Sequence, residues 1–111
     1  MILGRVIGTV WATRKERRLE GLKFLIVQHL DLKGKPLPSF DVAVDAVEAG
    51  VGERVLIAKG SSARQSDITD KKPVDAIIMA IVEGLEFYAI DELVKEYEKR
   101  EKEFLEAAGE F

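Results

Sequence analysis

The chain has 111 residues, 47% of them hydrophobic, and a formal net charge of −3 at pH 7, so it is long enough for one domain with its own core. A pI near 5.3 argues against a general nucleic-acid binder, which normally carries a basic excess. The absence of cysteine excludes disulfides, thiolate nucleophiles and zinc–thiolate sites.

The charge is unevenly divided along the chain. Residues 1–84 carry 13 basic and 11 acidic residues, a net charge of +2, whereas residues 85–111 carry 4 and 9, a net charge of −5. The sequence enters a strand pattern at once, which argues against a secretory signal, and no stretch approaches the roughly 18 apolar residues of a membrane span. We therefore expect a soluble intracellular protein with no membrane partner.

The first predicted strand covers residues 2–13. Its even positions are all apolar or glycine while its odd positions are mixed, the period-two pattern of a strand with one inward face. Gly4 and Gly8 fall on that inward face, where glycine often marks a bend, a bulge or a close backbone approach. The basic segment 14–21 is predicted to be a solvated loop, the alternative being that it faces an acidic partner.

Four more strands are predicted, at residues 23–31, 40–47, 54–58 and 75–83. Pro36 and Pro38 indicate a loop over residues 34–39, because proline cannot donate to a sheet ladder. The second and fifth strands are apolar on both faces, although a strand of a small domain should alternate on its solvent side. We expect the C-terminal helix to cover one of these faces and another subunit to cover the other.

The stretch from residue 42 to residue 64 reads as strand, glycine turn, strand and small-residue loop. The turn consists of Ala49, Gly50, Val51, Gly52 and Glu53, and the loop of Gly60, Ser61, Ser62, Ala63 and Arg64. Glycine enters positive φ and lets backbones approach closely. The stretch is therefore predicted to hold its loops in a fixed shape at a close contact.

The last predicted element is an amphipathic helix over residues 90–108. Its apolar residues recur at spacings of three, four or seven, but residues 98–103 are all charged. We expect the helix to pack on the body at its start and to project at its end. Five short strands and one terminal helix predict a mainly β fold, a five-stranded OB-like small β-barrel with a C-terminal amphipathic α-helix.

No constellation of residues predicts catalysis, a cofactor or a metal. His29, the single histidine, has no carboxylate pair nearby in the sequence and is interpreted as structural, and none of the common catalytic or phosphate-binding motifs occurs. Asp45 and Asp75 are interpreted as structural carboxylates that accept backbone N–H bonds or pair with Arg64. Acid–base work by these two carboxylates at a subunit interface remains an alternative.

A nucleic-acid-binding role is a second alternative, because OB-like barrels often have one. It requires aromatic side chains for base stacking along a basic groove. The aromatic residues here are scattered, with no interleaved basic residues. A small oligomeric OB-like binding module for nucleic acid or another ligand is therefore the weaker prediction.

Four segments of residues 1–84 closely resemble the vertex proteins of bacterial microcompartment shells, the EutN/CcmL family. They are ILGRVIGTVWATRK, GLKFLIVQ, VAVDAVEAGVGERVLIAKGSSAR and PVDAIIMAIVE. The combination of AGVGE with GSSAR is specific. Residues 85–111 lie outside the resemblance, which predicts a barrel domain over residues 1–84 and a helical acidic extension over residues 85–111.

The resemblance implies a structural protein rather than an enzyme. Family members form OB-like barrels that assemble into homopentamers, and these cap the fivefold vertices of shells built mostly of hexameric proteins. The expected location is the microcompartment shell in the bacterial cytoplasm, and the expected partners are other copies of the chain and hexameric shell proteins, with cargo at the C-terminal helix as a further option. We expect the AGVGE turn and the GSSAR loop to lie at subunit or vertex contacts.

Overall fold

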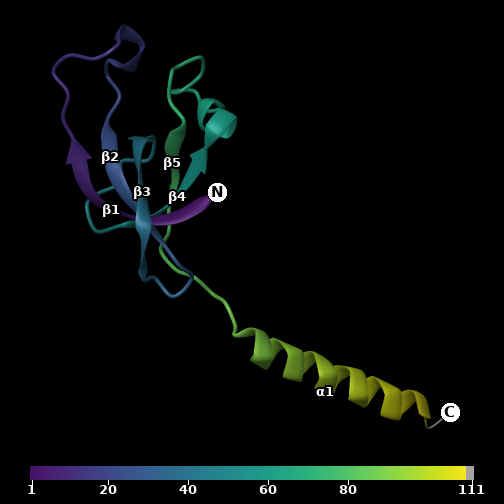
Figure 1. Ribbon diagram of the computed structural model, residues 1–111. Helices are drawn as coiled ribbons and strands as arrows, with labels where there is room; N and C mark the ends of the chain where they lie inside the picture. Colours follow the sequence, from purple (N-terminus) through teal and green to yellow (C-terminus); the bar gives the residue numbers. More distant parts are fainter. Residues whose placement is uncertain (110–111) are drawn as a thin grey trace.

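The structure is a computed structural model that describes residues 1–109 and consists of a small β-barrel followed by one long helix (Figure 1). The strands are β1 (Ile2–Val10), β2 (Phe24–Leu30), β3 (Pro36–Asp45), β4 (Arg54–Lys59) and β5 (Ala76–Ile81). Two short 3-10 helices, η1 (Arg17–Leu19) and η2 (Gly60–Arg64), lie in the loops, and α1 spans Ile90–Gly109.

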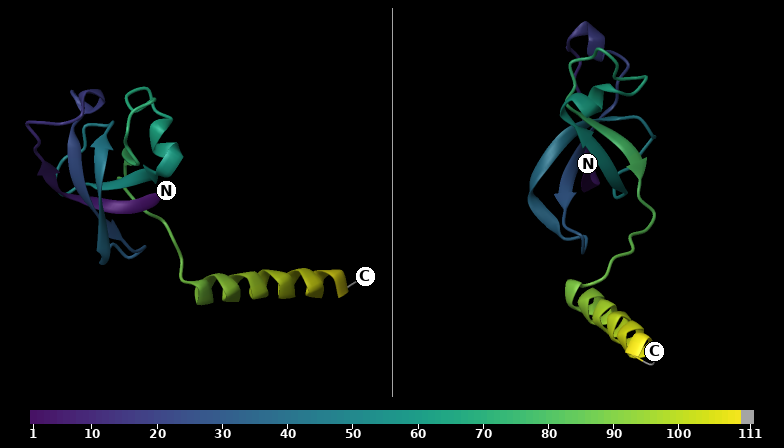
Figure 2. Two further views of the ribbon diagram at one scale, coloured as in Figure 1. Left: turned by 45° about the horizontal axis from the view of Figure 1, so that its top comes forward. Right: turned by 90° about the vertical axis from the view of Figure 1, so that its right-hand side faces the viewer.

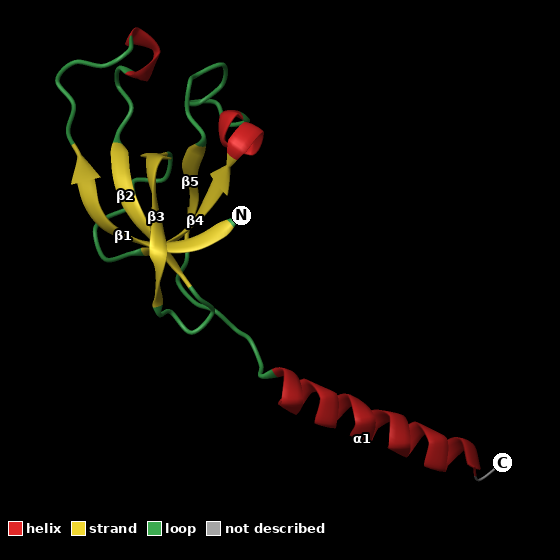
Figure 3. Cartoon of the chain, viewed as in Figure 1, coloured by secondary structure: helices red, strands yellow, loops and turns green. Residues whose placement is uncertain are grey.

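The five strands close into a barrel in the order β1-β2-β3-β5-β4 (Figure 3). Every neighbouring pair is antiparallel except β3 and β5, which run parallel and pair at Val44↔Ile77 and Asp45↔Ile78. Closure leaves no free sheet edge. The predicted mainly β fold, a five-stranded barrel with one C-terminal helix, is confirmed.

Two predicted strand limits differ most from the structure. β1 ends at Val10 rather than residue 13, and Trp11 beyond it is exposed. β3 begins at Pro36, inside the predicted loop. Pro36 is tolerated because it is the first residue of its strand. Pro38 lies where the register shifts from Gln28↔Phe40 to Leu30↔Pro36, so it occupies no regular position of the hydrogen-bonded ladder.

The barrel interior is filled by alternate side chains of all five strands. This core comprises Val6, Leu25, Val27, Ala43, Val55, Ile57, Ala76 and Ile78, together with Ala49 from the turn between β3 and β4. The prediction that even positions of β1 face inward holds for Gly4 and Val6 but is wrong for Gly8 and Val10. The register passes from Val6↔Val27 to Gly8↔Ile26, so Ile7 is an extra, bulged residue that reverses the alternation beyond it.

Gly4 meets the expectation of close backbone approach. A β-carbon added there would lie 2.8 Å from the carbonyl oxygen of Gln28 and would also overlap the side chain of Val27. Gly8 instead lies beside the bulge, the second meaning predicted for it, and its added β-carbon would meet only the end of the Ile26 side chain, at 3.4 Å. Only Gly4 is therefore required for β1 to lie against β2.

A second apolar cluster covers part of the outer surface of the sheet. It contains Val44, Ala58, Ala63, Val74 and Ile77, with Leu19, Leu22 and Phe24 packed against it. The cluster places η2 and the ends of the loops over the outer side of β5. The expectation that α1 or another subunit covers this strand is therefore wrong for Ile77, which is buried within its own chain.

The helix α1 stands apart from the barrel at the end of an extended linker (Figures 1 and 2). Every residue of α1 is exposed, so the expectation that its first turns pack on the barrel is wrong. The apolar side of the helix faces no other part of the described chain. Within residues 1–109, no helix is both long and apolar enough to cross a membrane.

Candidate assembly surfaces

Two bulges in the barrel each leave an apolar side chain on its outer surface. Ile7 is the extra residue of β1 opposite β2. Met79 has the same position in β5, because the register with β4 passes from Ile57↔Ile78 to Leu56↔Ala80. Their side chains are 50% and 40% exposed. A bulge re-aims a side chain, and here both aim an apolar group outward.

Ile7 belongs to an apolar surface that we call the β2–β3 face, formed by Ile7, Ile26, Phe40 and Val42. Ile26 lies between Gly8 of β1 and Val42 of β3 in the ladder. Ile7, Ile26 and Phe40 line a shallow hollow together with Gln28 and Pro38. Phe40 is 63% exposed. A contiguous apolar surface with polar groups at its edge is typical of an interaction site.

Met79 belongs to a second surface, the β4–β5 face, formed by Leu3, Leu56, Met79 and Ala80. Leu3 pairs with Leu56, and Leu56 pairs with Ala80, so the three lie in one row across β1, β4 and β5. The strand order β1-β2-β3-β5-β4 places the β2–β3 face and the β4–β5 face on different sides of the barrel. The molecule thus presents two apolar surfaces of different composition.

The AGVGE turn is held rigidly against β1. Gly52 has a φ of 94°, as the third position of a type II turn requires. Its N–H donates to the carbonyl of Val6 at 2.8 Å, and its own carbonyl accepts from Arg5 at 2.6 Å. The Glu53 carboxylate accepts from the N–H of Gly50. Val51, at the tip, remains exposed.

The segment preceding this turn is fixed by Asp45. Its carboxylate accepts from the N–H groups of Val47 and Ala49 at 3.1 and 3.2 Å and lies 3.8 Å from the ammonium group of Lys23. The interpretation of Asp45 as a structural carboxylate that accepts backbone N–H bonds therefore matches its geometry. Ala49 is buried in the barrel core, so its side chain is not available to a partner.

The GSSAR segment forms η2 rather than an irregular loop. Gly60 has a φ of 63° and donates to the carbonyl of Asp75 at 2.8 Å. Ala63 is fully buried in the second apolar cluster, whereas Ser61 and Ser62 are exposed. Of these three residues, the serines are therefore the ones whose side chains a partner can reach.

The predicted pairing of Arg64 with Asp45 or Asp75 is wrong. Arg64 donates to the backbone carbonyl of Val74 at 3.0 Å, and Asp45 has Lys23 as its basic neighbour. Asp75 is exposed on the outside of the chain. The Asp45 carboxylate accepts from the backbone of its own turn, so it is not free to act as an acid or base together with Asp75.

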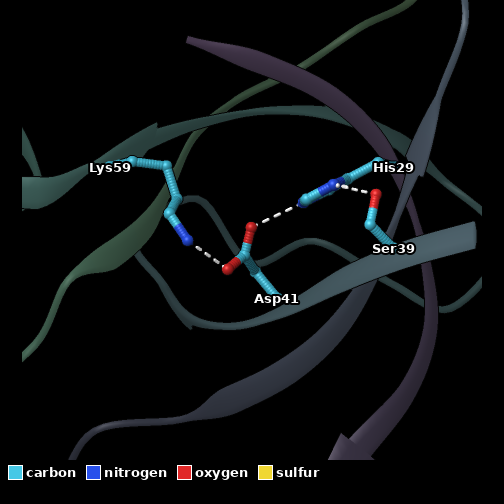
Figure 4. A network of polar contacts seen from close by, with 4 residues as sticks. All are labelled: His29, Ser39, Asp41 and Lys59. Atoms are coloured by element: carbon cyan, nitrogen blue, oxygen red, sulfur yellow. Dashed lines mark hydrogen bonds and ion pairs between the residues drawn. The ribbon is translucent and has the colours of Figure 1, made fainter. Parts of the chain in front are cut away.

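One end of the barrel interior is closed by a polar network around Asp41 (Figure 4). One carboxylate oxygen of Asp41 lies 2.5 Å from Nε2 of His29, the other pairs with the ammonium of Lys59, and Nδ1 of His29 lies 2.7 Å from the hydroxyl of Ser39. Burial alone would raise the pKa of Asp41, but the hydrogen bonds from Lys59 and His29 outweigh it and hold that pKa below its usual range.

Asp41 and Lys59 were not predicted as partners of His29, although the sequence contains a signal for them. His29 continues the inward positions Leu25 and Val27 at spacing two, and Asp41 and Lys59 do the same on β3 and β4. Three strands of one barrel therefore each carry one inward polar side chain after their inward apolar ones. His29 lies in this polar network, and its carboxylate partner comes from the neighbouring strand.

A comparison with family models agrees with this architecture. The model described as "Ethanolamine utilisation protein EutN/carboxysome" matches residues 1–83. The chain belongs to the EutN/CcmL family. The match ends two residues after β5, so most of the linker and all of α1 lie beyond it.

Relatives in the EutN/CcmL family bear names that describe shell vertices. The carboxysome shell vertex protein CcmL of Gloeobacter violaceus is 47% identical over 83 residues, 75% of this chain and 83% of the relative. The bacterial microcompartment shell vertex protein GrpN of Rhodospirillum rubrum is 48% identical over 86 residues, 78% of this chain and 97% of the relative.

Solved structures show the same fold. Gloeobacter violaceus CcmL superposes with a TM-score of 0.76 at 42% identity, covering 82% of this chain and 99% of the other. The Rhodospirillum rubrum GrpN structure, described as a pentameric microcompartment shell protein, gives 0.74 at 44% identity and covers 79% of this chain and all of the other.

Proposed function

We propose that this chain is a shell protein that forms homopentamers and caps the fivefold vertices of a bacterial microcompartment. Residues 1–84 form the vertex unit, and residues 85–111 are an extension of it, the last two lying outside the described residues. The family relationship supports this assignment, since similar proteins are named shell vertex proteins and one solved relative is described as pentameric. The location is therefore the microcompartment shell within the bacterial cytoplasm.

The observation that carries the proposal is the presence of two different apolar faces on one barrel. A cyclic ring with more than two subunits joins one surface of each subunit to a different surface of the next. The β2–β3 face and the β4–β5 face offer such a pair. In the ring, Phe40 and Ile7 of one subunit pack against Met79 and Leu56 of its neighbour.

The role of the ring is geometric. A unit of fivefold symmetry among hexameric shell proteins forces curvature and closes a corner of the shell. Its outer contacts are with those hexamers, and the AGVGE turn and the exposed serines of η2 are candidates for them. Small side chains there allow two backbones to come close, and the hydrogen bonds that fix both segments keep their shape constant.

We propose a structural rather than an enzymatic role. The strongest polar cluster, His29 with Asp41, is internally satisfied by Lys59 and Ser39. Among residues 1–109 there is no group of three or more histidine or acidic side chains suited to a metal ion. The relatives' names describe shell vertices and no reaction.

The native mass of the assembly tests the proposal. We expect a mass near five times the 12.4 kDa of the chain. Phe40→Asp should lower that mass, because a charge in a desolvated interface is unfavourable. Leu32→Asp is the matched control, since Leu32 is also exposed but lies in the turn after β2, outside both faces. A wild-type chain that stays monomeric would contradict the pentamer.

A further inference from the structure

The feature that remains unexplained is the apolar side of α1. Ile90, Tyr97 and Phe104 are 75%, 69% and 71% exposed. Most helical stability in proteins comes from packing of an apolar side against another surface rather than from helix propensity. We therefore expect another surface to cover the apolar side of α1, since the barrel of the same subunit does not.

The spacing of the apolar residues is that of a helical bundle. Ile90, Tyr97 and Phe104 recur every seven residues, and Leu93 with Val94 widens the stripe to three positions per heptad. Two positions per heptad are typical of a two-stranded seam, whereas three are typical of a helix facing the core of a larger bundle. The last heptad completes the pattern with Ala107 and Ala108.

The charged part of the stripe indicates which partner fits. In the middle heptad the equivalents of Leu93 and Val94 are Arg100 and Glu101, one cation beside one anion. In a parallel pair of identical helices in register, Arg100 of one helix lies near Glu101 of the next, so each copy neutralises the other. Within its own helix, Arg100 also lies 3.3 Å from a carboxylate oxygen of Glu96.

The linker allows identical helices to meet. Eight residues separate the end of β5 from the start of α1, and eight extended residues span at most about 26–29 Å. The molecule is only 27 Å across its second axis, so helices of adjacent ring subunits are within reach. Rotational symmetry places the helices on one side of the ring, and helices that align with the ring axis run parallel to one another. Tethering to the ring gives effective concentrations of roughly millimolar.

We propose that α1 is a self-association element: the apolar stripe of each helix packs against the α1 helices of the other copies in the same assembly, forming a parallel bundle on one side of the ring. This inference rests on the proposed pentamer. The middle layer of Arg100 and Glu101 sets the register, since a polar layer in an apolar seam specifies alignment.

Cross-linking of single cysteines tests the bundle, because the chain contains no cysteine. Tyr97→Cys places a thiol on the stripe, and Lys99→Cys places one on the opposite side of the helix. After mild oxidation of the assembled protein, we expect the Tyr97→Cys variant to form disulfide-linked dimers at least about fivefold faster than the Lys99→Cys variant, because bundle packing holds only the stripe thiols together.

Charge reversal provides a second measurement in the Tyr97→Cys background. Arg100→Glu should slow cross-linking severalfold, and adding Glu101→Arg should restore it, since the exchanged pair is again complementary between copies. A heterologous partner, whether a cargo protein or another shell protein, would not be restored by an exchange within this chain.

The outcomes separate this inference from the function on which it rests. Equal cross-linking at residues 97 and 99, or none at either, in a protein whose mass is still five chains would overturn the bundle and leave the pentamer intact. A monomeric mass would instead overturn the pentamer.

Discussion

At the scale of single residues, the barrel depends on one glycine that leaves no space for a side chain. Gly4 lies against the backbone carbonyl of Gln28, and backbone atoms cannot move aside as a flexible side chain does. Gly4→Ala should lower the free energy of unfolding by about 1–3 kcal/mol, the usual cost of overpacking. Urea unfolding at a fixed protein concentration measures it.

Gly8→Ala is the control for that substitution. It lies on the same strand, but its added methyl group meets only the end of the Ile26 side chain at an ordinary contact distance. Its effect should stay within about 0.5 kcal/mol. Equal destabilisation by the two substitutions would contradict the special role of Gly4.

Asp41 makes the barrel sensitive to acid. Its pKa is held below the ordinary 3.8 because the hydrogen bonds from Lys59 and His29 outweigh the effect of burial. A carboxylate whose pKa is lower in the folded state stabilises the fold above its unfolded pKa, and that contribution disappears as the pH falls through the folded value. Asp41→Asn should therefore cost about 1–3 kcal/mol at pH 7 and much less at the lowest pH at which the protein stays folded.

Unfolding of the Asp41→Asn variant at pH 7 and at acid pH tests this prediction. Asp75→Asn is the control, because Asp75 is exposed and its change should have little effect at either pH. If the Asp41→Asn cost were the same at both pH values, the ionised Asp41 network would not be the source of the stability.

At the scale of elements, substitutions at two neighbouring residues of η2 distinguish an effect on folding of the subunit from an effect on its assembly. Ala63 is fully buried in the second apolar cluster while its neighbour Ser62 is exposed. Ala63→Leu should destabilise the subunit itself by about 1–3 kcal/mol through overpacking. Ser62→Leu adds the same side chain at the surface, so it should leave the unfolding of the barrel nearly unchanged.

The native mass and shell incorporation of the same two variants then test the contact role of η2. Ser62→Leu should form normally folded subunits that fail to incorporate into shells, if the exposed serines meet a neighbouring protein. Normal incorporation of Ser62→Leu would remove η2 from the contact surface.

How far the sequence predicts these elements depends on what each pattern measures. Period-two alternation and glycine turns predicted the five strands and the barrel, because both report local backbone geometry. Gly8 indicated a bend or bulge in β1, and the bulge at Ile7 lies beside it. The bulge at Met79 has no such signal, since its position is defined by the partner strand and not by its own residues. Pro36 led to a wrong prediction of a loop, because proline is tolerated there only as the first residue of β3.

Polar partners were predicted less well than strands. Opposite charge predicted a pair of Arg64 with Asp45. In the structure, Arg64 donates to the carbonyl of Val74, and Asp45 accepts from the backbone of its own turn. The partner of His29 lies on the adjacent strand, 12 residues away. Side-chain pairing follows register, and register emerges only when the barrel closes.

At the scale of the whole molecule, two variants that each lose a different apolar face test whether the subunits join head to tail. Phe40→Asp disables the β2–β3 face and leaves the β4–β5 face intact, while Met79→Asp does the reverse. In a head-to-tail ring, each variant alone has no complementary pair of faces. It should remain monomeric at concentrations far below the roughly millimolar effective concentration that the ring gives to its α1 helices. Mixed one to one, the intact face of each finds its match in the other, so the mixture should form dimers of one copy of each and nothing larger.

The composition of those dimers decides the mode of assembly. A symmetric interface that joined like faces would instead let each variant dimerise by itself, through the face that remains intact. Native mass spectrometry resolves the cases if one variant is isotope-labelled, because the mixed dimer then has a mass between those of the two pure dimers. Pure dimers of either variant would contradict head-to-tail closure, and with it the geometry by which a fivefold ring forms.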